Sequence, residues 1–168
     1  MNLWENLCVL LDPQKQALYS WESAWADWCR STLTMSEVRS LVHKACKTYG
    51  VKPPSVRAHT GKAWSTYDPE TASISFERTQ RNTAIALHEA AHHILFTICL
   101  EEAGEESDGN FEDHGAEFCG IYLRLLRDAG VAPLIALTAS AEAAGLHFIP
   151  VRAAEPTRFR RHVARVLS

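Results

Sequence analysis

The side chains in this chain best suited to chemistry are His88, Glu89 and His92, which form an H-E-x-x-H pattern. They lie in the apolar, alanine-rich stretch 83–100, which is predicted to be a buried helix. Residues four apart share one face of a helix, so both imidazoles can offer a nitrogen to one zinc ion. Glu89 lies between them, where it can take a proton from a zinc-bound water. The pattern predicts a zinc site with hydrolytic chemistry.

A catalytic zinc site needs a third protein ligand, with a further position left open for water. Our candidate is His114, in the segment HGAEF at 114–118, where a second predicted helix begins. Glu117, one turn later on the same face, is the rival third ligand. If His114 binds the metal, Glu117 could instead hydrogen-bond a ligand imidazole and fix its tautomer. The sequence leaves this choice open.

Several other polar residues could surround such a site. His93 lies about 100° around the helix from His92, so we expect it to point away from the metal and to have a structural or outer role. Cys119 follows the HGAEF segment and is expected to pack as a small apolar residue. A hydrolase also needs a hydrogen-bond donor for the oxyanion. The candidates are Tyr67, Tyr122, His59 and His147.

The composition favours one soluble domain without a nucleic-acid signature. The 168 residues are 46% hydrophobic, enough for a substantial core, and the net charge of −3 gives no overall basic character. The N-terminus lacks the charged start and cleavage site of a signal peptide, and no apolar stretch reaches transmembrane length. Five scattered cysteines without a C-x-x-C pair argue against a disulfide framework. We therefore expect a cytoplasmic protein that does not use a membrane.

Helices are predicted on both sides of the motif region, within one domain that spans 1–168 and has its core at 36–130. Within 14–31, large apolar residues recur at spacings of three and four, which predicts a helix with an aromatic stripe. The stripe consists of Leu18, Trp21, Trp25 and Trp28. It is expected to pack on the core, with a partner-binding surface as the alternative. A second helix is predicted from about Ser36 to Gly50, and a helical extension over 131–168 includes a helix at 133–144.

Between the first helices and the motif helix, the pattern changes to short strands separated by turns. The predicted strands are Ser55–His59, Ala63–Tyr67 and Ala72–Phe76. In the last strand, Ser73–Phe76 alternates with period two, and we treat it as a hypothetical edge with which an extended peptide could pair. It leads into the motif helix, for which Thr79 is the predicted N-cap. A small three-stranded sheet packed against the motif helix and further helices makes the predicted fold class α+β.

Two charged segments lie beside these elements. Between Glu101 and Asp113 the chain holds seven acidic residues and no lysine or arginine, which predicts a solvated loop. The segment 156–168 is locally basic and is interpreted either as surface charge or as a contact for an anion such as a nucleic-acid backbone. Its arginines are Arg158, Arg160, Arg161 and Arg165.

Over about residues 36–130, the chain resembles the SprT-like, minigluzincin-type zinc metallopeptidases, chiefly through LHEAAHHILF and the more discriminating HGAEF. The resemblance implies a compact zincin-like domain with His88, His92 and His114 as zinc ligands and Glu89 as the catalytic residue. Many relatives carry a cysteine zinc ribbon or another nucleic-acid module, and this chain has no such ribbon. The Trp-rich N-terminal helix and the C-terminal third lie outside the resemblance.

The leading interpretation is a cytoplasmic zinc metallopeptidase of bacterial or phage type that acts on a peptide or protein substrate. One alternative is a binding or regulatory protein that keeps a zincin scaffold without catalysis, although the intact Glu89 favours the enzyme. Another is a nucleic-acid-associated protein that uses the basic C-terminal segment. The sequence does not specify an oligomeric state.

Overall fold

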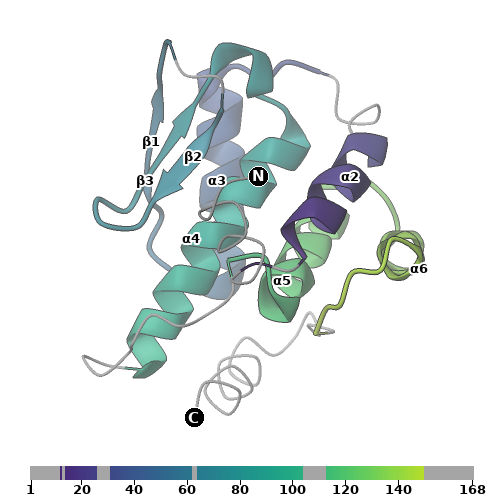
Figure 1. Cartoon of the computed structure of the whole chain (residues 1–168). Helices are drawn as coiled ribbons and strands as arrows, with labels where there is room; N and C mark the ends of the chain where they lie inside the picture. The colour runs from purple at the N-terminus through teal and green to yellow at the C-terminus, as the bar shows by residue number, and fades with distance from the viewer. Residues whose placement is uncertain (1–11, 13, 26–30, 62–63, 104–112, 150–168) are drawn as a thin grey trace, which may run out of the picture.

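A computed structural model describes residues 12, 14–25, 31–61, 64–103 and 113–149, with the backbone alone at 99–103. In these residues the protein has five α-helices and one three-stranded sheet, which confirms the α+β prediction. The elements are α2 (Lys15–Trp25), α3 (Met35–Tyr49), β1 (Ser55–Ala58), β2 (Thr66–Asp68), β3 (Ser73–Phe76), the short 3₁₀ helix η2 (Arg78–Gln80), α4 (Thr83–Ala103), α5 (Ala116–Asp128) and α6 (Leu134–Ala143). Figure 1 shows the sheet on one side of the long helix α4, with α2, α5 and α6 on the other.

Helix α4, which carries the H-E-x-x-H pattern, is the central element of the fold. Its sequence is apolar on nearly all sides, as expected for a helix surrounded by protein. Ala86, Ala90 and Ile94 are completely buried, and α3, α5 and β2 pack around the helix. The predicted buried helix is therefore confirmed, and its motif residues are held in a closely packed frame.

The N-terminus of α4 differs from the prediction. Thr79 lies in η2, where its backbone N–H donates to the Glu77 side chain. The side chain of Asn82 accepts a hydrogen bond of 2.9 Å from the N–H of Ile85 and so caps α4. The prediction that Thr79 is the N-cap was wrong because Glu77 engages the N–H and hydroxyl of Thr79. The α-helix begins only where Asn82 provides an acceptor.

The sheet has the order β1-β3-β2, with β3 parallel to β1 and antiparallel to β2. All four residues of β3 are buried, so the hypothesis that Ser73–Phe76 is an edge strand was wrong. The strand lies between β1 and β2, and its serines are small and hydrogen-bonded: Ser75 Oγ lies 3.2 Å from Thr66 Oγ1 and Ser73 Oγ lies 2.9 Å from Thr71 Oγ1. The edge strand beside α4 is β2.

Helix α3 begins and ends close to the predicted residues. Thr34 and Glu37 form a capping box at its N-terminus, in which each side chain binds the other's backbone N–H. Gly50 closes the C-terminus with φ 68°, a left-handed conformation that glycine adopts without steric cost. Val38 and Val42 are completely buried on the face of α3 that packs into the core.

Helix α2 packs its aromatic stripe against the core, as predicted. Leu18 and Trp21 are buried, and Trp25 packs against the same hydrophobic cluster. The indole Nε1 of Trp21 donates a 3.0 Å hydrogen bond to Ser140 Oγ on α6. This interaction anchors α2 to the far side of the molecule from the sheet (Figure 1). Trp28 lies outside the described residues.

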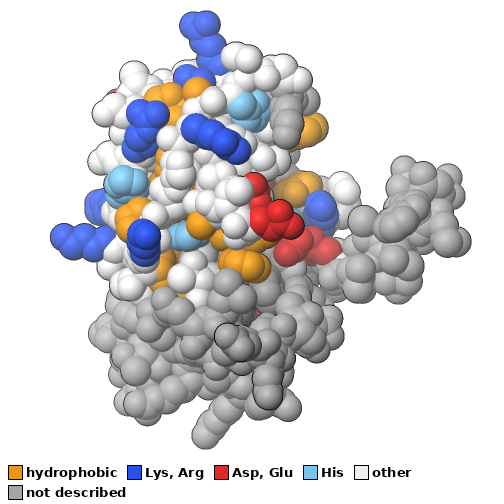
Figure 2. Space-filling view, turned by 90° about the vertical axis from the view of Figure 1, so that its left-hand side faces the viewer, with side chains coloured by type: hydrophobic (Ala, Val, Ile, Leu, Met, Phe, Trp, Pro, Cys, Tyr) orange, Lys and Arg blue, Asp and Glu red, His pale blue; other side chains and the backbone are white. Residues whose placement is uncertain are grey.

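Beyond α5 the chain forms α6, which confirms the predicted helix at 133–144. Residues 147–149 of the predicted helical extension form neither helix nor strand, and the N–H of Ile149 donates to the carbonyl of Ala116 at 3.0 Å. Most of the acidic loop and the whole basic segment 156–168 lie outside the described residues. On the sheet-side face in Figure 2, Lys and Arg side chains are dispersed among polar and apolar ones. Within the described helices, none has the length and hydropathy needed to cross a bilayer.

Candidate metal centre

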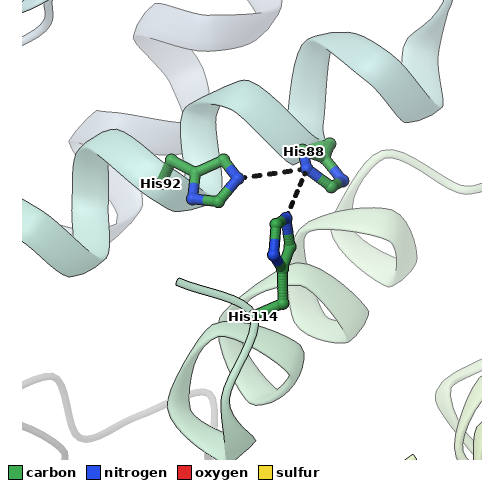
Figure 3. Close-up of side chains that lie close together, drawn as sticks. All are labelled: His88, His92 and His114. Atoms are coloured by element: carbon green, nitrogen blue, oxygen red, sulfur yellow. Dashed lines mark hydrogen bonds between the residues drawn. The ribbon is translucent and has the colours of Figure 1, made fainter. Parts of the chain in front are cut away.

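Three histidine side chains converge between α4 and the start of α5 (Figure 3). His88 and His92 project from α4, and His114 stands two residues before α5 begins. Nε2 of His88 lies 3.1 Å from Nε2 of His92 and 3.3 Å from Nε2 of His114. One ring nitrogen from each residue lies within 4.8 Å of the others. The three side chains are therefore close enough to bind one metal ion.

The structure brings His114, the predicted third ligand, to the two histidines of α4. Among the described residues, the side chains close enough to share a metal are these three histidines, and Glu117 does not join them. Glu117 lies in the first turn of α5 and is partly exposed. It is the His114 ring, and not the Glu117 side chain, that packs edge-on against the His92 ring, with 4.7 Å between the ring centroids.

Two carboxylates contact the outer nitrogens of the histidine rings. Nδ1 of His88 donates a 2.7 Å hydrogen bond to Oε1 of Glu22, and Nδ1 of His114 donates to Oδ2 of Asp12. Sequence reasoning considered Glu117 for this tautomer-fixing role and missed both residues. The sequence does hold one pattern that could have pointed to Glu22. Polar side chains recur at helical spacing along α2 and form a second face beside the aromatic stripe, at Lys15, Tyr19 and Glu22.

These carboxylate contacts determine where the ring nitrogens keep their lone pairs. An ionised carboxylate only accepts hydrogen bonds, so Nδ1 carries the proton and Nε2 keeps its lone pair in His88 and His114. The two Nε2 atoms lie 3.3 Å apart on the inner side of the group. Each ring, when neutral, therefore presents a lone pair where a metal ion could bind.

The protonation of the histidines differs with their surroundings. Burial, together with the nearby His88 and His114, whose protonation disfavours a further positive charge, holds the pKa of His92 well below its usual value of 6.5. Burial also lowers the pKa of His88, but the charge and the hydrogen bond of Glu22 outweigh it and raise that pKa overall. His92 is thus kept neutral, which is the form that can bind a metal.

Glu89 lies beside the histidine group, and its side chain lines the same cavity. The residue is only 7% exposed, and this burial raises the pKa of its carboxyl group. Two groups lower this pKa in turn: His88, and the backbone N–H of Tyr67, which donates a hydrogen bond to the Glu89 side chain. Glu89 is therefore a buried carboxylate held beside the candidate metal position by the edge strand β2.

Two cavities meet at this centre. The first, of about 440 Å³, is lined by all three histidines and Glu89, together with residues of β2. The second, of about 640 Å³, shares Glu89 and His88 with the first and extends between α2 and the start of α4. Space for a bound molecule is thus present in two cavities that share Glu89 in their walls.

The four oxyanion donors suggested by the sequence have different surroundings. Tyr67 alone of the four lines either of these two cavities, and its hydroxyl lies 3.3 Å from Nδ1 of His93. The buried hydroxyl of Tyr122 donates to the carbonyl of Ala84. His59 lies beside the Trp64 carbonyl, and His147 is exposed.

Tyr19 of α2 is a polar residue at the centre that sequence reasoning missed. It lines both cavities, and its ring centroid lies 5.9 Å from that of His88 and 5.4 Å from that of His114. Burial, with the charges of Glu22 and Glu89, raises the pKa of its hydroxyl to about 12. At neutral pH the hydroxyl is therefore protonated and able to donate a hydrogen bond.

The structural roles predicted for His93 and Cys119 are confirmed. Nε2 of His93 donates a 2.8 Å hydrogen bond to the carbonyl of Lys52, so its Nδ1 accepts from the hydroxyl of Tyr67. His93 thereby ties α4 to β2 and does not join the metal group. Cys119 is buried, and its thiol donates to the carbonyl of His114.

The centre thus combines three converging imidazoles, a buried carboxylate and an adjoining cavity. Comparisons with protein-family models, with curated proteins and with solved structures found no match to this chain. Its chemistry must therefore be inferred from the geometry of its own side chains.

Proposed function

We propose that this protein is a zinc-dependent metallopeptidase that hydrolyses peptide bonds with Glu89 as its general base. The proposal is carried by one observation, the three-histidine group and the buried Glu89 in the wall of one cavity. Catalytic zinc sites have three protein ligands and an open position, whereas structural sites are closed by four ligands. A purely structural site has no use for Glu89, which supports an enzyme over a catalytically silent scaffold.

The distances from Nε2 of His88 to the other two ring nitrogens fit zinc. With Zn–N distances of about 2.0–2.1 Å, two ligand nitrogens of a tetrahedral site lie about 3.3–3.4 Å apart. Nε2 of His88 lies 3.1 Å and 3.3 Å from the nitrogens of its two partners. Imidazole ligands also suit other transition metals. We choose zinc because the H-E-x-x-H pattern on a helix is typical of zinc hydrolases.

The proposed mechanism assigns proton transfer to Glu89. When bound, zinc would lower the pKa of a coordinated water and polarise the scissile carbonyl. The Glu89 carboxylate accepts the proton of the attacking water and later delivers it to the leaving amine. The hydrogen bond from the Tyr67 N–H holds the carboxylate in the cavity wall for both steps.

The two cavities support a peptide that continues on both sides of the scissile bond. They meet at His88 and Glu89, and both include Thr66 of the edge strand β2. An edge strand offers unpaired backbone groups with which an extended peptide can pair. We therefore place the substrate along β2, and not along the central strand β3.

Metal removal tests this function. The full-length protein, stripped with a chelator, is expected to lose all cleavage of a mixed peptide library, followed by mass spectrometry. Stoichiometric zinc is expected to restore it, with circular dichroism as a check that the fold is retained. Undiminished cleavage by protein shown to be metal-free would refute the proposal. Failure of the zinc-loaded protein to cleave any library peptide would favour the binding or regulatory alternative.

The hydroxyl of Tyr19 is our candidate donor to the oxyanion, because it lines both cavities beside His88 and His114. Loss of one such donor typically costs about 10²–10³-fold in kcat. We expect Tyr19→Phe to lower kcat by about 10²-fold and to leave KM and zinc content unchanged. This is the lower end of that range, because the metal would also stabilise the oxyanion. Tyr67→Phe is the matched comparison and should have a smaller effect on kcat. Wild-type kcat in Tyr19→Phe would remove this assignment.

We further infer that the chain is a SprT-like peptidase of bacterial or phage type that acts in the cytoplasm. LHEAAHHILF and HGAEF support the family, and they supply the residues that converge at the centre. The described cysteines Cys46 and Cys119 are free and buried, which accords with a reducing compartment.

A further inference from the structure

We propose that Glu22 and Asp12 are positioning residues of the metal centre, which makes the N-terminal segment 12–25 an integral part of that centre. This segment lies outside the region of family resemblance. The inference depends on metal binding alone, so it can be tested whether or not the protein cleaves peptides.

The contacts themselves specify what the two carboxylates do. Glu22 receives the Nδ1 proton of His88, and Asp12 receives the Nδ1 proton of His114. Each contact fixes the tautomer in which Nε2 is free to bind a metal, and it also fixes the plane of the ring. The two Nε2 atoms so prepared lie 3.3 Å apart, on the inner side of the centre. The carboxylates stand on the outer side of the rings, where they act through the histidines.

Charge balance favours the same role. Three neutral imidazoles bring no charge to a divalent cation, so the bound centre would carry two positive charges in a largely buried position. The side chains of Glu22 and Asp12 are 13% and 10% exposed, and each contacts a ligand ring directly. Each supplies a negative charge that offsets part of the charge of the cation and strengthens a ligand nitrogen as an electron-pair donor.

Helix α2 is built to hold Glu22 in this place. Its aromatic stripe packs into the core, and the Trp21 indole bonds to Ser140 on α6. Tyr19 and Glu22 lie on the neighbouring face, which faces the metal centre. Because a helix fixes the angle between its faces, burial of one stripe sets the position of the other.

The residues before α2 hold His114 at two points. Besides the ring contact of Asp12, the side chain of Gln14 donates a 3.3 Å hydrogen bond to the His114 carbonyl. Gln14 is itself buried, and its side-chain oxygen accepts the N–H of His147. The third ligand is thus fixed at its ring and at its main chain by the same short segment.

Zinc affinity of the full-length protein, measured by competition with a chromophoric chelator, tests the proposal. Loss of a carboxylate that orients a metal-binding histidine typically weakens affinity about 10–100-fold. We expect Glu22→Gln, which keeps an acceptor but no charge, to weaken zinc binding about tenfold. Glu22→Leu, which keeps neither, should weaken it about 100-fold. Asp12→Asn should resemble Glu22→Gln, and Glu142→Gln on the exposed surface of α6 is the matched control.

A second measurement separates positioning from general destabilisation. In the zinc-bound wild type, the ¹⁵N shifts of the imidazoles should show that Nδ1 of His88 is protonated. In Glu22→Gln, the Nδ1 shift of His88 should change, and the shifts of His114 should stay the same. Asp12→Asn should change His114 and leave His88 as it is. Zinc affinities within twofold of the wild type in Glu22→Leu and Asp12→Asn would overturn the proposal. So would equal losses of affinity in the Glu142→Gln control.

Discussion

Replacing Glu89 by glutamine is expected to abolish peptide hydrolysis and to leave zinc content unchanged. Glutamine has the same shape and can still accept the Tyr67 N–H, but it cannot take a proton from the attacking water. Loss of a general base typically costs about 10²–10⁴-fold in rate, and we expect a loss of at least that size in kcat/KM. Zinc content should persist because the metal group consists of the three histidines without Glu89.

The Glu89→Gln experiment compares the rate of cleavage of the best library peptide with zinc content by elemental analysis. Glu70→Gln, in the exposed turn between β2 and β3, is the matched control for the same chemical change. Equal cleavage by Glu89→Gln and wild type would show that another group carries the proton. A zinc-free Glu89→Gln protein would show that Glu89 belongs to the metal site instead.

The second large effect is expected at His114. His114→Ala should reduce zinc binding below detectable stoichiometry and lower cleavage to the level of the metal-free protein. The reason is that His88 and His92 alone provide two of the three protein ligands that catalytic zinc sites use. The loss of affinity should exceed the about 100-fold expected for the outer carboxylates.

Glu117→Gln is the informative comparison for His114→Ala, because the sequence left these two residues as rivals. We expect Glu117→Gln to keep wild-type zinc affinity, since its side chain does not join the histidine group. Both variants are measured by chelator competition after circular dichroism confirms their fold. Tight zinc binding by His114→Ala, together with loss in Glu117→Gln, would reverse the assignment.

The parts of this centre that the sequence predicts are those governed by local geometry. The His88–His92 pair follows from helix periodicity, and HGAEF marked His114 through a motif. The carboxylate partners could not be predicted in this way. Glu22 is 66 residues from His88 in sequence, and Asp12 is 102 residues from His114. Such contacts depend on how whole helices dock, and no local spacing rule encodes them.

The errors in the fold have a similar origin. Helices and strands were predicted well where periodicity was strong, as in α3 and α4. The predicted position of β3 within the sheet was wrong, because polar serines look solvated in sequence. In the structure they are buried, and their hydroxyls hydrogen-bond to Thr66 and Thr71. The polar face of α2, with Tyr19 and Glu22, looks like an ordinary solvated helix face for the same reason. Polar residues in a functional interior cannot be distinguished by residue type from polar residues on a surface.

The centre draws its parts from positions 12 and 22, from α4 and from position 114. With the zinc binding proposed above, the ion would be a reversible cross-link between chain segments that are remote in sequence. Because the unfolded chain lacks this arrangement, each tenfold rise of free zinc above Kd adds about 1.4 kcal/mol to the free energy of unfolding. With the proposed zinc binding, the stability of this fold, and not the proposed activity alone, would depend on the supply of metal around it.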